Sequence, residues 1–200
     1  MSLCTWLYVV AKRSPRKFKI MIKEFNKFQN KGKMVAVYHG LGGGGGKLIP
    51  RLLRKYGFNR IHYPEIDYES EWDKDMCKSM FNRELDRIKH ADLIVGFSLG
   101  GYLAFELAGY TGKNLMLINP AIDRTKTLLD IKWFDIPTKR NFGNVEVYLG
   151  TEDDLIDKQW TIDYLKKLNV KSDIYLVPGM EHSTYIEEFE VMLDNSKLIW

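Results

Sequence analysis

The residues that point most directly to chemistry are Gly96–Gly101 (GFSLGG), a Gly-x-Ser-x-Gly-Gly run that follows the apolar stretch 93–95. This order predicts a short buried strand that turns sharply into a helix, with Ser98 at the apex of the turn. The glycines two residues before and after the serine leave room where a side chain would collide. The apolar pattern of Tyr102–Ala108 continues the helix, which we expect to end at Gly109. Ser98 is therefore a candidate nucleophile.

A serine hydroxyl attacks a carbonyl only when a base accepts its proton and an acid holds that base in one tautomer. In an open parallel sheet, ligands bind at the carboxyl ends of the strands, so we expect both partners just past strands. Asp153 follows the strand predicted at 145–149, and His182 follows the strand predicted at 173–177. Serine, acid, histidine is the chain order of such a relay in this architecture. We therefore predict Asp153 as the acid and His182 as the base.

Other residues compete for these two roles. The neighbouring acids of the same loop are Glu152, Asp154 and Asp157, of which Asp154 is the main alternative. Three further histidines occur in the chain. His39 closes a predicted strand, and we expect it to brace the next loop by hydrogen bonding. His62 lies within a predicted strand, and His90 ends a predicted helix, where a cation suits the helix dipole.

The negative charge that develops on the attacked carbonyl needs two hydrogen-bond donors. The backbone N–H of Leu99 comes first in the helix after the serine and is one candidate donor. The second is expected in the loop after the first strand, where Leu41 directly follows His39-Gly40. We predict the backbone N–H groups of Leu41 and Leu99 as the oxyanion hole.

Alternating strands and helices must position these side chains. Strands are predicted at 34–38, 60–63, 91–97, 114–118, 145–149 and 173–177, and helices at 48–56, 72–89, 102–108, 157–168 and 186–193. Short apolar strands that alternate with helices predict a mostly parallel sheet of about six strands covered on both faces. The apolar segment 121–141 is either a cap over the site or a helix that packs on the core.

The charge of the chain divides it into two parts. Residues 1–33 hold nine lysines and arginines against one acid, Glu24, whereas residues 34–200 hold 21 basic and 25 acidic residues. We therefore expect a basic N-terminal arm or helix (1–33) and a main domain (34–200). The basic stretch 12–33 is able to contact a polyanion weakly. Alternatively, its lysines are the solvated face of a helix whose apolar stripe is Phe18, Ile22, Phe25 and Phe28.

Several classes of protein are disfavoured by composition. No apolar window approaches the roughly 18 residues of a membrane span. The N-terminal charges follow the apolar run, the reverse of a secretory signal, so we expect a cytoplasmic protein. Cys4 and Cys77 are too few for a disulfide framework, and neither lies in a metal-ligand cluster.

Residues 34–200 resemble the α/β-hydrolase superfamily and, within it, the small, nearly lidless YqiA-type bacterial esterases. The matching stretches are Y-H-G-L at 38–41, G-F-S-L-G-G-Y-L-A at 96–104, L-I-N-P-A at 117–121, E-D-D-L-I-D at 152–157 and G-M-E-H-S-T-Y at 179–185. The resemblance implies a three-layer α/β-hydrolase sandwich with a minimal cap. It implies hydrolysis of short acyl esters of small molecules without metal or organic cofactor, with Ser98, Asp153 and His182 as the triad.

The chain departs from that family in its first loop, where five glycines follow Leu41, in the acid loop, where Glu152 replaces the usual glycine, and in its basic arm. The glycines Gly40, Gly42 and Gly45 also fit a dinucleotide-binding pattern, although a five-glycine tract satisfies almost any such pattern. A thioesterase or amidase with the same triad and a non-catalytic interaction module on the same scaffold remain alternatives.

Overall fold

The computed structural model describes residues 24, 29–44, 46–68, 74–123 and 141–199. Its strands are β1 (Met34–Tyr38), β2 (Arg60–His62), β3 (Leu93–Phe97), β4 (Asn114–Ile118), β5 (Val145–Gly150) and β6 (Asp173–Val177). They form one sheet in the order β2-β1-β3-β4-β5-β6, and each neighbouring pair is parallel. The described helices are α3 (Leu48–Lys55), α4 (Lys74–Arg87), α5 (Ser98–Thr111), α6 (Lys158–Lys167) and α7 (Ile186–Asn195).

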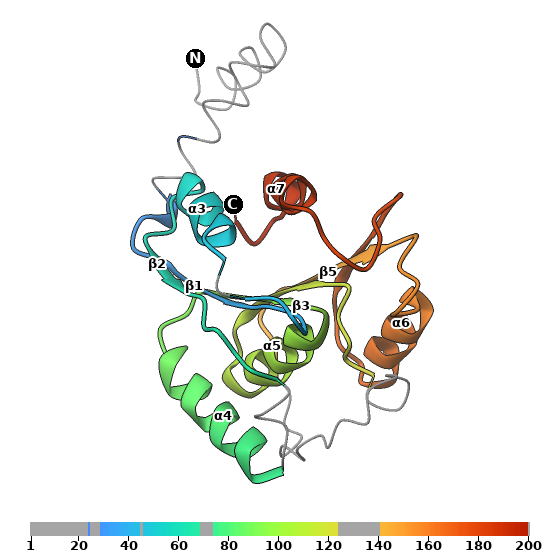
Figure 1. Ribbon diagram of the computed structural model, residues 1–200, viewed down its shortest axis with the longest axis horizontal. Helices are drawn as coiled ribbons and strands as arrows, with labels where there is room; N and C mark the ends of the chain where they lie inside the picture. Colours follow the sequence, from blue (N-terminus) through green and yellow to red (C-terminus); the bar gives the residue numbers. More distant parts are fainter. Residues whose placement is uncertain (1–23, 25–28, 45, 69–73, 124–140, 200) are drawn as a thin grey trace, which may run out of the picture.

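The elements form three layers, with α3 and α7 on one face of the sheet and α4, α5 and α6 on the other (Figure 1). Alternate strand residues supply the two cores because successive side chains of a strand point to opposite faces. In β1, Val35 and Val37 join the cluster under α3 and α7, whereas Ala36 and Tyr38 join the cluster under α4 and α5. The predicted fold, a parallel six-stranded sheet with helices on both faces, is therefore confirmed.

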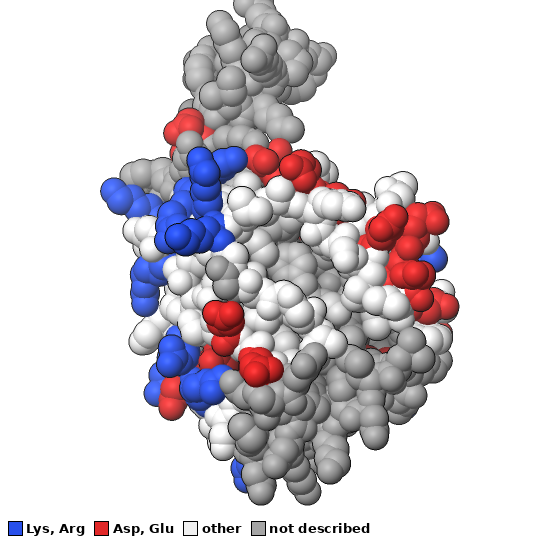
Figure 2. All heavy atoms as spheres, viewed as in Figure 1, with Lys and Arg blue, Asp and Glu red and all other residues white. Residues whose placement is uncertain are grey.

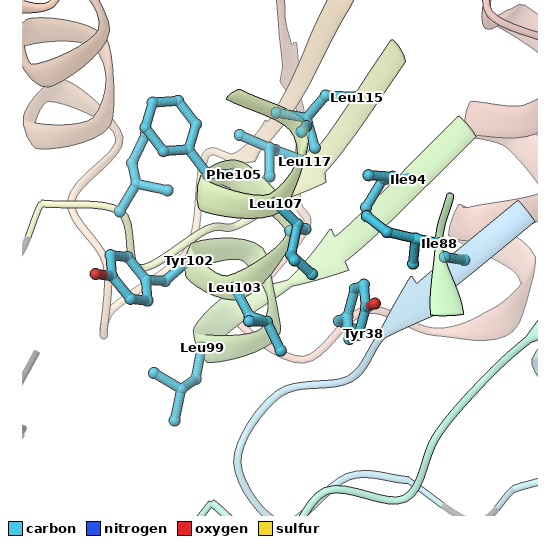
Figure 3. Packing of buried hydrophobic residues seen from close by; sticks show 14 of the residues in the cluster. Tyr38, Ile88, Ile94, Leu99, Tyr102, Leu103, Phe105, Leu107, Leu115 and Leu117 are labelled. Atoms are coloured by element: carbon cyan, nitrogen blue, oxygen red, sulfur yellow. The ribbon is translucent and has the colours of Figure 1, made fainter. Parts of the chain in front are cut away.

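Helix α5 is the most deeply enclosed of the described helices that position the site. Every residue from Leu99 to Gly109 is buried, as expected for a helix that is apolar on all sides. Figure 3 shows Leu103 and Leu107 of this helix in one cluster with Tyr38 of β1 and Ile94 of β3. The first residue of α5 is Ser98, so the packing of the whole helix fixes where that serine lies.

The predicted end of this helix is wrong by one turn. We expected Gly109 to end it, but α5 runs to Thr111 and its C-cap is Gly112, with φ 72°. Gly109 is buried within the helix, and the hydroxyl of Thr111 donates to the carbonyl of Leu107 at 2.7 Å. Glycine ends a helix where a left-handed residue lets the chain leave it, and that position is Gly112.

Other element bounds agree with the predicted ones to within a few residues. Helix α6 begins at Lys158 because Asp157 is its N-cap, with Oδ1 accepting from the N–H of Gln159 at 2.7 Å. Most of the predicted cap, 124–140, lies outside the described residues, as do the first two residues of the helix predicted at 72–89 and the apolar stripe of the arm. The side chain of Cys77 is also outside the description.

The end of the predicted arm contacts the main domain. The side chain of Asn30 is fully buried, and its Nδ2 donates to the carbonyls of Tyr56 at 3.0 Å and Ile199 at 3.3 Å. These bonds attach residues on the N-terminal side of β1 to the end of α3 and to the C-terminal segment. In the part of the chain that the structure describes, no helix is both long and apolar enough to span a bilayer.

Candidate active site

Ser98 lies in a strained turn between β3 and α5. Its φ is 49°, in the left-handed region that few non-glycine residues adopt. The flanking glycines explain how the chain makes this turn. A Cβ on Gly96 would lie 2.5 Å from the Cβ of Ala104, and a Cβ on Gly100 would overlap the backbone carbonyls of Tyr38 and His39. The predicted strand–turn–helix geometry is therefore present around this serine.

The structure brings Ser98, His182 and Asp153 together. The Nε2 atom of His182 is 2.9 Å from the Oγ of Ser98, and its Nδ1 is 3.0 Å from both carboxylate oxygens of Asp153. A carboxylate accepts hydrogen bonds and does not donate them, so the ring proton of His182 is assigned to Nδ1. The Nε2 atom then accepts a hydrogen bond from the hydroxyl of Ser98. The side chain of Asp153 is 2% exposed and that of His182 is 18% exposed, so the histidine alone of this pair contacts solvent appreciably.

The loop after β5 aims Asp153 at the histidine. Its Oδ1 accepts from the backbone N–H groups of Leu155 at 3.0 Å and Ile156 at 2.9 Å. These bonds hold the carboxylate in one orientation. The competing acids have other roles or positions: Glu152 and Asp154 are exposed, and Asp157 caps α6. Asp153 is the acid of this loop that contacts His182.

The other histidines lie elsewhere. The Nε2 of His39 accepts from the N–H of Ile66 at 3.0 Å, and its Nδ1 lies 2.7 Å from the carbonyl of Gly40, so it braces the loop after β1 as expected. His62 pairs with buried Glu84 at 2.6 Å. His90 is exposed after the end of α4.

The predicted oxyanion donors lie beside the serine. Leu99 follows Ser98 in the first turn of α5, where backbone N–H groups have no acceptor within the helix. Leu41 belongs to a turn closed by the bond from Gly43 N–H to the carbonyl of Gly40 at 3.1 Å. A Cβ on Gly40 would lie 3.0 Å from the Cβ of Ser98, so this turn packs directly against the serine. The glycine tract thus borders the candidate site.

A cavity of about 270 Å³ opens over Ser98 and His182, with Leu41 in its wall. A second cavity of about 240 Å³ continues from it and is lined mainly by apolar side chains. Four residues line both cavities: Ile49, Tyr63, Phe97 and Thr184. Burial raises the pKa of Tyr63, so its phenol stays neutral. Tyr63 lines the cavity, whereas Tyr68, on the same segment after β2, is buried.

A third cavity, of about 600 Å³, lies near the opposite ends of β5 and β6 and contains none of the predicted site residues.

Charge differs between the two sides of the molecule in Figure 2, with basic side chains over α3 and acidic ones on the opposite side of the view. The exposed cations of this helix and its N-cap are Lys47, Arg51, Arg54 and Lys55. Among the described residues, no group of three or more histidine, cysteine, aspartate or glutamate side chains is placed to hold a metal ion.

One residue of the site was not predicted to have a role. The sequence patterns identify Asn119 only as a member of the L-I-N-P-A stretch and predict no role for it. In the structure its side chain contacts the segment that contains His182. The available signal was its position directly after β4, at the same edge of the sheet as the other site residues.

No family model matches the chain, and no curated protein does. Solved structures do match. An S-formylglutathione hydrolase from Staphylococcus aureus is 17% identical with a TM-score of 0.61, over 81% of this chain and 78% of that chain. An α/β serine hydrolase without lid from Xanthomonas campestris is 19% identical with a TM-score of 0.56, over 82% and 79%.

The fluorophosphonate-binding serine hydrolase F of Staphylococcus aureus is 15% identical with a TM-score of 0.56, over 81% of this chain and 80% of that chain. These likenesses show that the chain has the α/β-hydrolase fold. At such low identity they establish the fold alone, whereas the chemistry depends on the side chains at the site.

Proposed function

We propose that this protein is a serine hydrolase that cleaves carboxylic esters of short acyl groups through an acyl-enzyme. The observation that carries the proposal is the 2.9 Å contact between the Oγ of Ser98 and the Nε2 of His182, with Asp153 on the other ring nitrogen. A hydroxyl, a neutral imidazole and a carboxylate in this order are the arrangement that activates serine for attack on a carbonyl.

In the proposed reaction the Oγ of Ser98 attacks the ester carbonyl carbon, and His182 accepts the hydroxyl proton at Nε2. The ester oxygen becomes an oxyanion that accepts hydrogen bonds from the N–H groups of Leu41 and Leu99. The carbon–oxygen bond to the alcohol then breaks, and His182 donates its proton to the leaving alcohol. Water repeats the sequence on the acyl-enzyme and releases the acid. Asp153 stays ionised and stabilises the imidazolium in both halves.

The size of the cavities supports short substrates. Each of the two cavities, of about 270 and 240 Å³, is smaller than an ordinary ligand pocket, for which the lower end of the range is about 300 Å³. The apolar lining of the second cavity suits a hydrocarbon group rather than a charged one. Its motifs resemble those of YqiA-type esterases, and on that resemblance we propose the same substrate class. Thioester or amide cleavage would use the same triad and differ in the leaving group.

The test is hydrolysis of p-nitrophenyl acetate and butyrate by Ser98→Ala and His182→Ala variants. Each should lose about three orders of magnitude in kcat, because each removes a group that acts in the transition state. Ser79→Ala and His90→Ala, at exposed positions on or just after α4, are matched controls that should keep the wild-type rate. Turnover that is unchanged in Ser98→Ala would rule out the proposal.

Two further measurements separate this proposal from its alternatives. A fluorophosphonate should label the wild type and not Ser98→Ala, whereas an interaction module without activity would not be labelled. The value of kcat/KM should rise with pH through one ionisation, since His182 must be neutral to accept the proton. A profile that is flat between about pH 5 and 8 would contradict a histidine base.

A further inference from the structure

Asn119 has an unusual backbone conformation at the edge of the sheet that holds the site. It follows the last residue of β4, is 2% exposed and has φ 42°. Few non-glycine residues adopt left-handed values, and asparagine is among those that tolerate them. Its main-chain N–H donates to the carbonyl of Tyr148 at 3.0 Å, which attaches the turn to β5. This conformation directs the chain, and with it the amide, away from the direction of the strand.

The side-chain amide of Asn119 joins two loops. Its Nδ2 donates to the carbonyls of Glu181 at 2.7 Å and His182 at 3.2 Å, and its Oδ1 accepts from the N–H of Gly150 at 2.7 Å. The partners fix the orientation of the amide, because carbonyls accept and an N–H donates. One buried group thus links the end of β5, just before the Asp153 loop, to the segment that contains His182.

The two residues after Asn119 contact the nucleophile segment. The N–H of Ala121 donates to the carbonyl of Ser98 at 2.9 Å. A Cβ on Gly101, in the first turn of α5, would lie 2.7 Å from the Cβ of Pro120, so the two segments are in close contact. The segment 119–121 therefore contacts all three chain segments that contain the proposed triad.

We propose that Asn119 is a positioning residue that sets the distance from His182 to Ser98 by holding the backbone carbonyl of the histidine. This inference rests on the proposed function. The imidazole reaches Ser98 across a 2.9 Å contact, and a displacement of about 1 Å at such a contact lowers a rate about a hundredfold. Asn119 acts through His182 and does not itself need to touch the substrate.

The His182 segment has other attachments, so loss of the amide should displace it rather than unfold it. The N–H of Glu152 donates to the carbonyl of Met180 at 3.1 Å, and the N–H of Gly179 donates to the hydroxyl of Thr151 at 2.9 Å. These bonds precede His182 in the chain. The two bonds from Asn119 act at positions 181 and 182, next to the imidazole.

The test compares Asn119→Asp with Asn114→Asp. The first keeps an oxygen for Gly150 N–H but places a carboxylate oxygen against the two carbonyls that now accept from Nδ2. Asn114 begins the same strand, and its Oδ1 accepts from the N–H of Asn144 at 2.9 Å, at the far end of β4 from the site. It is therefore a matched control.

For Asn119→Asp we expect kcat on p-nitrophenyl butyrate and the rate of fluorophosphonate labelling to fall about tenfold to a hundredfold, with KM within about twofold of wild type. Asn114→Asp should keep all three values within about twofold. Asn119→Gly also accepts the left-handed backbone, without strain, and loses every side-chain bond. It should show the same loss of kcat, and it tests the positioning role of Asn119 if Asn119→Asp does not fold.

Wild-type kcat in a folded Asn119 variant would overturn the positioning role. A loss of kcat no larger than the loss of folded protein, measured by urea unfolding, would also overturn it. The Ser98→Ala variant is measured alongside. If Ser98→Ala is inactive and the Asn119 variants are normal, only the positioning role fails. If Ser98→Ala is fully active, or the wild type is not labelled, the proposed function fails and the positioning role fails with it.

Discussion

Replacing Gly96 with alanine should displace Ser98 without altering any side chain of the candidate site. The added Cβ would lie 2.5 Å from the Cβ of Ala104 and 2.6 Å from the Cα of Gly101. Carbon atoms in contact are normally about 3.5–4.0 Å apart. Strand β3 and helix α5 would therefore have to separate by about 1 Å, and the serine lies at their junction.

Two magnitudes follow from this displacement. Overpacking a buried contact lowers the free energy of unfolding by about 1–3 kcal/mol. At about 2–4 °C per kcal/mol for a chain of this size, the midpoint of thermal unfolding should fall by roughly 2–12 °C. A shift of about 1 Å between the hydroxyl of Ser98 and the imidazole of His182 should lower kcat about a hundredfold.

The assay combines thermal unfolding with p-nitrophenyl butyrate turnover, and Ala104 provides the control. The double variant Gly96→Ala with Ala104→Gly removes the 2.5 Å contact, so it should recover part of the lost rate. Ala104→Gly alone should cost about 1 kcal/mol in helix stability and keep its rate. Wild-type kcat and midpoint in Gly96→Ala would refute the reasoning. A double variant no better than Gly96→Ala would exclude the contact with Ala104 as the cause.

Three other predictions concern the core, the apolar cavity and the arm. Burial raises the pKa of Glu84, but bonds from His62, Arg83 and Tyr38 outweigh burial and lower it below its ordinary 4.5. The resulting stabilisation is present above pH 4.5 and disappears as pH falls through the lowered pKa. Glu84→Gln should therefore cost about 1–3 kcal/mol in urea unfolding at pH 7 and less at pH 3, and an equal cost at both would contradict this. Each methylene that enters the apolar cavity should raise kcat/KM about fourfold in an acyl-length series. Ile49→Trp should abolish that gain and Val191→Trp, on an exposed position of α7, should not; a gain that survives Ile49→Trp would place the acyl chain elsewhere. Removal of residues 1–28 should weaken retention on heparin and leave kcat unchanged, whereas a deletion that includes buried Asn30 should also lower the thermal midpoint. Unchanged retention would exclude the polyanion contact.

The strands and the positions of Ser98, Asp153 and His182 could be predicted because each depends on a local pattern. An apolar run that ends at glycine or proline marks the carboxyl end of a strand, and the parallel topology then gathers these ends at one edge. The choice of Asp153 over Asp154 also agrees with the geometry, since Asp153 contacts His182 and Asp154 is exposed.

What could not be predicted depends on contacts between distant segments. Gly109 looked like a helix end, yet it is buried inside α5, and the cap is Gly112. The amide of Asn119 bonds residues about 60 positions away, and no local pattern specifies such partners. The pairing of His62 with Glu84 is of the same kind, since the local pattern predicts only that His62 lies in a strand.

The left-handed backbone of Ser98 has a consequence for how this protein could evolve. A non-glycine residue in that conformation costs about 1–2 kcal/mol, which is a sizeable share of the stability of an ordinary domain. Glycine at position 98 would relieve that cost, so selection for thermal robustness alone would favour losing the hydroxyl. A serine that persists there under mutational drift would record selection for reactivity at the expense of stability.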